Sequence, residues 1–342
     1  MNSFPKHLGK LFFFIFIPFE ILFISLVKIR ILFYTKLLKR ENTSENPIVV
    51  SIGNLSMGGT GKTPTCLALY SILQKKYKTA IFLRGYKSKG EGLSDEEQVY
   101  KSYISSDHVF VNPLRLESWR KAKSLSYQVA LLDDGFQHLK IDRQLDVVVI
   151  DALKPPHKSA CIPRGMLREP MSSLKRAHWI VFTRCEQVSK EYLHSLIDIL
   201  KRRFVHLEYF FAYSKFSVQI MKKNNDESLD LKKSFIFSGI GHPENFEKSV
   251  LNQGIELMGK KFYSDHYHYS QKDISLIEEK ALSANATYIL CTEKDWVKIK
   301  SFEFSLPIAV LKMEFSIEGE TGKPIENFLI EKINSLYTMQ SN

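Results

Sequence analysis

The sequence predicts an α/β fold, in which a P-loop NTPase-like, mostly parallel sheet with helices on both faces is joined to a second, smaller α/β domain and to an N-terminal membrane-associated helix. Three observations predict it. A β-branched run leads through a glycine-rich loop into a helical stretch, further strand patterns end in acids, and residues 11–27 are almost wholly apolar. With 342 residues, of which 44% are hydrophobic, the chain is long enough for two modest domains.

The apolar segment at residues 11–27, LFFFIFIPFEILFISLV, is at the short limit for a helix that crosses a bilayer, and Pro18 and Glu20 interrupt it. Five basic residues come after it among apolar ones: Lys28, Arg30, Lys36, Lys39 and Arg40. This pattern is typical of a basic amphipathic helix on an anionic membrane and places the later part of the chain on the cytoplasmic side. We expect a membrane anchor at residues 1–40, either spanning or interfacial; a buried core helix is the alternative.

The composition limits the class of binding partner and the redox compartment in which the protein folds. The formal net charge of +11 favours an acidic partner, but no zinc-finger, basic-zipper or RNA-binding aromatic motif accompanies it, so we expect no nucleic acid partner. The four cysteines are far apart in the sequence: Cys66, Cys161, Cys185 and Cys291. Because no C-x-x-C pair occurs, a zinc site of the usual spacing is not expected, and free thiols in a reducing cytosol fit best.

A phosphate loop is indicated at residues 53–63, GNLSMGGTGKT, between the strand pattern PIVVSI and the helical stretch PTCLALYSILQKKY. In such a Walker A loop, backbone N–H groups surround phosphate oxygens at a helix amino terminus. Lys62 is expected to reach the β- and γ-phosphates, and the Thr63 hydroxyl to ligate magnesium. Ser56 stands where the usual pattern has glycine. The expected nucleotide-binding residues are Ser56, Met57, Gly58, Gly59, Thr60, Gly61, Lys62 and Thr63.

A phosphate loop needs an acid at the end of a neighbouring strand to hold magnesium. The pattern VALLDD ends in Asp133 and Asp134, and the pattern LDVVVIDA ends in Asp151. We expect Asp133 and Asp134, together with Thr63, to form the magnesium site, because a doubled acid is rarely placed at a strand end for packing alone. For Asp151, an ordinary turn acid is the favoured interpretation.

In this order, GNLSMGGTGKTP, LRGYKSKG, LLDDGFQH and PRGMLREP resemble the tetraacyldisaccharide 4′-kinases of lipid A biosynthesis. FSGIGHPENF, YSDHYHY and TEKDWVK continue the resemblance, which covers about residues 45–300. The resemblance implies ATP and Mg²⁺ as cofactors. It implies transfer of the γ-phosphate to the 4′-hydroxyl of a lipid A precursor, an acylated glucosamine disaccharide 1-phosphate. It also implies a place at the cytoplasmic face of the bacterial inner membrane, in agreement with the anchor.

The resemblance further implies catalytic roles for Asp95, His266 and Lys62. Asp95, in LSDEEQVY, matches the family's general base, and His266, in FYSDHYHY, matches the histidine that pairs with this base. Ser94 stands where the family has glycine. Without the family, a solvated loop acid is the favoured interpretation of Asp95, and a packed, satisfied histidine is the favoured interpretation of His266.

Four more residues are expected to contact the phosphorylated acceptor: Arg84, Arg164, Arg168 and Glu169. Arg84 comes directly after the strand pattern TAIFL, and the other three lie in PRGMLREP, where prolines stiffen a loop and arginine forks suit phosphate. Ordinary surface charges are the alternative for all four.

The predicted domains are the anchor at residues 1–40, a P-loop nucleotide-binding kinase domain at 41–220, and a smaller α/β domain at 221–342 that closes over the active site. The alternative function is a membrane-associated ATPase or GTPase switch without an acceptor substrate. The guanine-reading pattern N-K-x-D does not occur in the sequence, where the nearest segment, TEKDW, lacks the Asn. A nucleic-acid-binding module ranks lower, because that function would not explain the presence of a phosphate loop.

Overall fold

The computed structural model describes residues 15–37, 47–85, 95–222, 232–241, 243–265 and 267–341. They form two compact units, the first within residues 1–213 and 315–342 and the second within residues 214–314. The prediction from sequence assigned all of 221–342 to the second domain. The structure differs, because residues 315–342 belong to the first unit.

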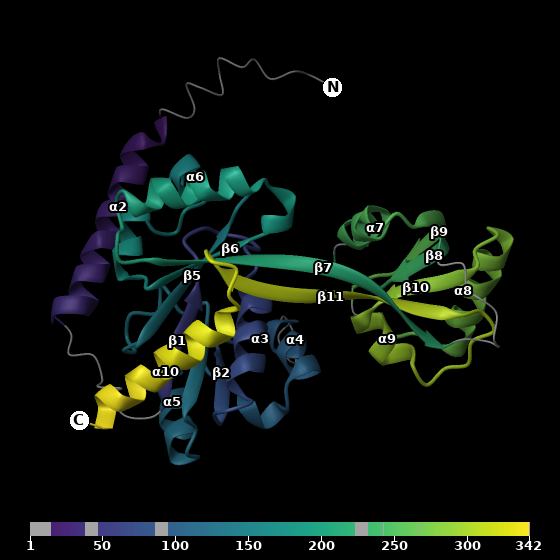
Figure 1. Cartoon of the computed structure of the whole chain (residues 1–342), viewed down its shortest axis with the longest axis horizontal. Coiled ribbons are helices and arrows are strands. Elements are labelled where there is room, and N and C mark those ends of the chain that lie inside the picture. The colour runs from purple at the N-terminus through teal and green to yellow at the C-terminus, as the bar shows by residue number, and fades with distance from the viewer. Residues whose placement is uncertain are drawn as a thin grey trace. The chain divides into compact units, whose positions relative to one another are not determined.

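The first unit is built on a parallel sheet with the strand order β3-β2-β4-β1-β5-β6-β7 (Figure 1). Its strands are β1 (Ile48–Gly53), β2 (Thr79–Leu83), β3 (Val109–Val111), β4 (Val129–Asp133), β5 (Leu145–Asp151), β6 (Trp179–Thr183) and β7 (Glu208–Lys222). Strands β1, β2, β4, β5 and β6 are buried along their whole length, as expected of Val- and Ile-rich strands that are covered on both faces.

Helices cover both faces of this sheet, which confirms the predicted architecture. On one face α3 and α10 pack around Ile52, and on the other α5 packs around Phe82 and α6 around Ile150. The helices of this unit are α2 (Ile17–Leu32), α3 (Lys62–Leu73), α4 (Asp95–Tyr103), α5 (Arg115–Ser124), α6 (Lys190–Lys201) and α10 (Ile325–Ser341). Short 3₁₀ segments are η2 (Ser106–His108), η3 (Pro156–Lys158), η4 (Met171–Arg176) and η5 (Cys185–Gln187), and η1 (Phe33–Leu37) is a π-helix.

The last helix of the chain is part of the first unit. Three side chains of α10 lie in the hydrophobic cluster that contains the buried face of α3: Ile325, Leu329 and Ile333. The Tyr337 hydroxyl donates to Gln128 O at 2.7 Å, which ties the end of α10 to the segment before β4.

The second unit is a smaller α/β unit, as predicted. Its parallel strands have the order β11-β10-β8-β9. They are β8 (Lys233–Ser238), β9 (Glu256–Phe262), β10 (Tyr288–Thr292) and β11 (Ile308–Gly319), with helices α7 (Pro243–Asn252), α8 (Gln271–Ser283) and α9 (Glu293–Ile299). Strands β7 and β11 each contribute residues to both units.

Strand register brings the glycine-rich loop and the paired acids to one edge of the sheet. Ile52 lies opposite Asp133, and Gly53 lies opposite Val148. The approach is close, because a Cβ atom added at Gly53 would lie 2.4 Å from Phe136 Cβ. Ligands of parallel α/β sheets bind at this carboxyl edge.

The predicted anchor falls partly within the described residues. Helix α2 covers Ile17–Leu32, whereas residues 1–14 and 38–46 lie outside them. No helix in the described part of the chain has the length and hydropathy that a bilayer crossing requires. The apolar side chains of α2 are largely exposed, for example Ile21 at 59% and Leu26 at 57%.

Candidate functional site

The glycine-rich loop connects β1 to α3 as the sequence predicts. Gly61 caps the helix with φ +90°, and Gly58 has φ +96°, both in the left-handed region that favours glycine. Met57, Gly58 and Gly59 are exposed, so the outer turn of the loop is accessible to a ligand. Strand, loop and helix amino terminus therefore form an anion-binding arrangement.

Two buried polar residues, Asn54 and Thr183, hold the loop through hydrogen bonds to Thr60. Asn54 is fully buried, and its Nδ2 donates to Thr60 Oγ1 at 2.8 Å. Thr183, at the end of β6, donates its Oγ1 to Thr60 O at 2.8 Å. Sequence reasoning did not single out Asn54 or Thr183. The available signal was a polar residue directly at the carboxyl end of a buried strand.

Three predicted site residues meet in one charged cluster. Lys62 Nζ lies 3.5 Å from Asp134 Oδ1. Arg168 donates to both oxygens of the same carboxylate, at 2.7 Å from Nη2 and 3.0 Å from Nη1, and its Nη2 also donates to Asn54 Oδ1. The fork geometry of arginine makes this contact bidentate and directional. The phosphate loop, the DDGFQH turn and the PRGMLREP segment thus converge on Asp134.

Asp133 has a different environment from its neighbour. It is 1% exposed, and its carboxylate accepts from the Tyr100 hydroxyl at 2.7 Å and from the Asp134 N–H at 2.8 Å. Tyr100 belongs to α4, the helix that begins at Asp95. The structure describes Asp95 by its backbone alone, and His266 lies outside the described residues, so their pairing stays a prediction.

The two acids also differ in proton affinity. Burial raises the pKa of Asp133 above its ordinary value, although the Tyr100 hydrogen bond acts in the opposite direction. Burial also acts to raise the pKa of Asp134, but hydrogen bonds and charge from Arg168, with the charge of Lys62, outweigh burial and hold this pKa below its ordinary value. Asp134 is therefore the ionised carboxylate of the cluster at neutral pH.

The PRGMLREP segment lies along the glycine-rich loop. Arg168 N–H donates to Leu55 O at 2.7 Å, and Met57 N–H donates to Met166 O at 2.8 Å. The two segments also form an isolated antiparallel bridge at Ser56. Backbone hydrogen bonds therefore fix the PRGMLREP segment against the glycine-rich loop, and these contacts place Arg168 beside Asp134.

Asp151, the alternative acid, has a separate partner. Its Oδ2 lies 2.6 Å from Arg184 Nη1, and Arg184 Nη2 donates to Gly59 O at 3.1 Å. Arg184 has φ +60°, which is uncommon for a residue other than glycine. Asp151 therefore acts on the phosphate loop through Arg184, a residue that sequence reasoning missed because nothing local to it marks a site.

A cavity of about 860 Å³ adjoins the charged cluster. Its basic lining residues are Arg30, Arg84, Arg115, Lys140 and Arg168, its acids are Glu117 and Asp134, and its apolar residues include Phe23, Val27, Leu114, Leu116, Leu139 and Ile162. The cavity is thus amphipathic, with cations beside an apolar wall that α2 helps to form. Arg30 of α2 donates to Gln137 O at 2.9 Å, and Gln137 Nε2 donates to Asn54 O at 2.9 Å.

The four residues that were expected to contact the acceptor substrate lie in different places in the structure. Arg84 and Arg168 line this cavity, whereas Arg164 and Glu169 do not. Arg164 Nε lies 2.6 Å from Glu20 Oε2 of α2. Glu169 is 2% exposed and pairs with Arg176 at 2.9 Å, so its carboxylate is committed to the interior of the fold. The sequence of PRGMLREP does not indicate that Arg164, Arg168 and Glu169 have different partners.

A histidine of the DDGFQH turn also lines the cavity. Burial, together with the charges of surrounding cations, of which Arg115 and Arg143 are the strongest, lowers the pKa of His138 to about 4. The imidazole is therefore neutral at physiological pH. No pattern in the sequence indicates a role for this histidine.

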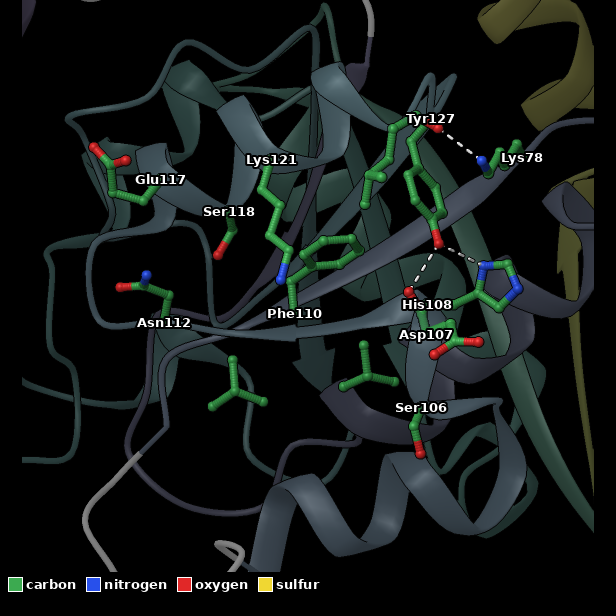
Figure 2. A pocket seen from close by; sticks show the side chains of 13 residues that line it. Lys78, Ser106, Asp107, His108, Phe110, Asn112, Glu117, Ser118, Lys121 and Tyr127 are labelled. Atoms are coloured by element: carbon green, nitrogen blue, oxygen red, sulfur yellow. Dashed lines mark hydrogen bonds between the residues drawn. The ribbon is translucent and has the colours of Figure 1, made fainter.

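A second cavity, of about 680 Å³, lies at the edge strand β3 (Figure 2). Figure 2 shows the Tyr127 hydroxyl directed towards His108 and the Asp107 backbone, at 3.2 Å from His108 Nδ1 and 2.8 Å from Asp107 O. No residue of the glycine-rich loop and none of the predicted site residues lines it. The candidate site is therefore the charged cluster and its adjoining cavity.

Comparison with known proteins gives a consistent result. The model of the family described as tetraacyldisaccharide-1-P 4′-kinase matches residues 12–334. The tetraacyldisaccharide 4′-kinase of Desulfotalea psychrophila is 33% identical over 312 residues, which are 85% of this chain and 89% of the relative. That of Halothermothrix orenii is 30% identical, with 93% of each chain covered. The crystal structure of "apo" form LpxK from Aquifex aeolicus in complex with ATP is similar with a TM-score of 0.65 and 26% identity, covering 94% of this chain and 99% of that one.

Proposed function

The chain belongs to the tetraacyldisaccharide-1-P 4′-kinase family, and we propose the following function for its site. The protein is a kinase of lipid A biosynthesis that transfers the γ-phosphate of ATP to the 4′-hydroxyl of a tetraacyldisaccharide 1-phosphate. The observation that carries this function is the cluster of Lys62, Asp134 and Arg168 at the border between a phosphate loop and an amphipathic cavity. A switch without an acceptor has no use for that cavity.

The nucleotide half of the site is the loop at residues 56–63. In the reaction the bond between the γ-phosphorus and its bridging oxygen breaks, a new bond forms to the 4′-oxygen, and ADP leaves with the electron pair. The Lys62 ammonium neutralises charge on the migrating group, and backbone N–H groups of the loop hold the phosphates in line. The proton of the 4′-hydroxyl goes to the general base, for which Asp95, oriented by His266, remains our proposal.

The residues at the loop fit a magnesium ion. Magnesium prefers oxygen ligands and is held by one or two carboxylates or hydroxyls together with phosphate oxygens. The carboxylates of both acids accept hydrogen bonds, so exposure distinguishes them. Asp134 is ionised, its side chain is 23% exposed and it lines the cavity, whereas Asp133 is 1% exposed. We propose that Asp134 and Thr63 would hold the ion and that Asp133 fixes the turn. When bound, magnesium neutralises charge on the β- and γ-phosphates.

The acceptor half of the site is the cavity beside Asp134. A disaccharide 1-phosphate with acyl chains needs cations for its phosphate and apolar surface for its chains. Arg84 and Arg168 supply the former, and Phe23 and Val27 of α2 contribute to the latter. The physical support for this assignment is the juxtaposition of both surface types next to the phosphate loop.

Membrane contact through α2 is a further part of the proposal. Its exposed apolar side chains include Phe19, Ile21, Leu22, Leu26 and Ile29, each more than half exposed. A contiguous apolar helix face of this kind fits the interface of a bilayer. A lipid acceptor lies in the same plane, so we propose that the enzyme works at the cytoplasmic face of the inner membrane.

The deciding experiment traces ³²P from γ-labelled ATP into a defined tetraacyldisaccharide 1-phosphate in mixed micelles, with chromatographic separation of the products. Wild type should label the lipid, and Lys62→Ala should lose at least about 10²-fold in rate, since one such electrostatic group contributes about 3 kcal/mol. Lys201→Ala is the matched control, because Lys201 forms an exposed ion pair with Glu320. ATP hydrolysis that needs no lipid, with no labelled lipid, would refute the kinase assignment.

A further inference from the structure

Helix α2 has an unusual distribution of buried and exposed side chains. Within Ile17–Leu32, all of which the structure describes, the one buried side chain is an acid, Glu20, which is 7% exposed. Its apolar neighbours Phe19 and Ile21 are 56% and 59% exposed. A charged side chain is expensive to remove from water unless it is paired, so its burial among exposed apolar residues requires a specific partner.

The partners of Glu20 lie in the segment after η3. Its Oε1 accepts the Cys161 N–H at 2.7 Å, and its Oε2 lies 2.6 Å from Arg164 Nε. Both carboxylate oxygens are therefore used by one short stretch of chain. Glu20 stabilises nothing within its own helix through these contacts, so its burial serves the attachment of α2 to residues 161–164.

The segment that Glu20 holds is compact. Ile162 N–H donates to Leu167 O at 3.1 Å, and Leu167 N–H donates to Ala160 O at 3.1 Å. A Cβ atom added at Gly165 would lie 2.3 Å from Ala160 O, so the turn is closed to larger residues. A displacement at Cys161 would therefore be transmitted to Leu167 instead of being absorbed between them.

The other end of the segment is the phosphate loop. Arg168, the next residue, donates its backbone N–H to Leu55 O at 2.7 Å and its guanidinium to Asp134. Six residues thus lie between Cys161, which Glu20 of α2 contacts, and Arg168, which contacts Asp134.

We propose that Glu20 is a positioning residue for phosphoryl transfer, which acts through Cys161 and Arg164 to hold Arg168 at Asp134. The inference rests on the proposed function for its catalytic consequence. Under it, α2 is a structural part of the active site as well as a membrane contact. A change at Glu20 impairs turnover even where the acceptor is dispersed in detergent and no membrane has to be found.

The test uses the full-length chain in mixed micelles with three variants. Glu20→Ala removes both contacts. Glu20→Gln keeps an acceptor for the Cys161 N–H and loses the charge pair with Arg164. Ser25→Ala is the matched control, because Ser25 is exposed on the same helix and its hydroxyl donates to Ile21 O of its own helix at 2.8 Å.

For Glu20→Ala we expect kcat to fall about 10- to 100-fold, since a displacement of about 1 Å in a site group can cost about 10²-fold. KM for ATP should change less than about twofold, because the backbone donors of the loop remain. Glu20→Gln should recover part of kcat, and Ser25→Ala should match wild type. A kcat for Glu20→Ala within about twofold of wild type would overturn the proposal.

A second measurement separates local release from general destabilisation. Cys161 and Cys185 are both buried in the same hydrophobic cluster, at 3% and 2% exposure. In Glu20→Ala, iodoacetamide should label Cys161 faster than in wild type and leave Cys185 protected, as peptide mass spectrometry resolves. Equal labelling of both thiols would show that Glu20 only stabilises the fold and would refute the positioning role. If wild type itself phosphorylates no disaccharide, the proposed function fails, and labelling of Cys161 alone still decides whether Glu20 holds the segment.

Discussion

At the residue scale, the site depends on two adjacent acids with opposite surroundings. Asp133 is buried and hydrogen-bonded to Tyr100, and burial raises its pKa. Asp134 meets Arg168 and Lys62, which hold its pKa low in spite of its partial burial. The two acids therefore have different roles. Asp133 holds α4 through Tyr100, and Asp134 places a negative charge beside Lys62 of the phosphate loop.

Magnesium dependence should distinguish the two acids. We expect Asp134→Asn to raise the magnesium concentration for half-maximal activity by at least about tenfold or to stop turnover, because one ionised ligand is lost. Asp133→Asn should shift this concentration less and lower the melting temperature more, because it weakens the Tyr100 contact. Magnesium titrations and thermal scans measure both effects, with the exposed Asp107→Asn as control. Unchanged titrations for both site variants would exclude this pair and direct attention to Asp151.

Acid should destabilise the protein through His138. Its folded pKa of about 4 lies below its ordinary value of 6.5, so between these values the unfolded chain binds a proton that the folded chain does not. Stability therefore falls as pH drops from about 6.5 towards 4, by about 1–3 kcal/mol for this group. His138→Gln should flatten the dependence of the melting temperature on pH in this window, and the exposed His194→Gln should not. Parallel curves for wild type and His138→Gln would contradict the assignment.

At the element scale, α2 has two surfaces with different uses. Glu20 and Arg30 attach it to the first unit, while its apolar side chains remain exposed. The hydrophobic pattern alone suggested a helix that needs either lipid or burial. The structure describes a helix that is held by these polar contacts and by the partly buried Phe23 and Ile24, while its other face, with Leu22 and Leu26, stays exposed.

Substitution on the exposed face of α2 should release the protein from vesicles. We expect the double variant Leu22→Ser and Leu26→Ser to lower the vesicle-bound to free ratio by roughly 20- to 300-fold, because each leucine is 57% exposed and burying that exposed part contributes roughly 0.9–1.7 kcal/mol. Flotation with anionic vesicles measures the ratio, and Val205→Ser, at an apolar residue that is 89% exposed elsewhere, is the control. Point variants are preferable to deletion of residues 1–40, which also removes Glu20. Full retention of vesicle binding would place the main membrane contact outside this face.

At the scale of the whole molecule, the chain leaves the first unit within β7, after Tyr213, and returns to it within β11, at Phe315, before α10. The first unit is therefore discontinuous in sequence. Its core includes Ile325, Leu329 and Ile333, so residues near the carboxyl terminus help to stabilise the helix that begins at the phosphate loop.

Truncation after residue 324 should unfold the first unit. The three buried α10 side chains contribute about 1.5–3 kcal/mol each, and their sum is comparable with the stability of about 5–15 kcal/mol typical of a domain. We expect the truncated chain to be insoluble or to lose its cooperative thermal transition and its ATP binding. Removal of residues 341–342 alone is the control. A truncated chain that melts and binds ATP like wild type would show that α10 is dispensable.

The phosphate loop, the paired acids and the α/β class could be predicted from the sequence alone, because each depends on one contiguous run of residues. A buried strand, a glycine-rich turn and a helix each have a local periodicity and composition that can be recognised without knowing their tertiary contacts. The motifs around Lys62 and Asp134 identified the family, which the comparisons confirm. The roles of Asp95 and His266 remain predictions from that resemblance.

Which side chains of one motif point into the site depends instead on the folding of the whole first unit. Arg168 reaches Asp134, while Arg164 turns to Glu20 and Glu169 to Arg176, although all three lie in one segment. The phosphate loop is also supported from strand ends that sequence spacing does not connect, by Asn54, Thr183 and Arg184. The physical reason is that such contacts depend on strand register and on pairing between segments far apart in the chain, which no local periodicity records. The same reason explains why the return of residues 315–342 to the first unit could be seen only in the folded chain.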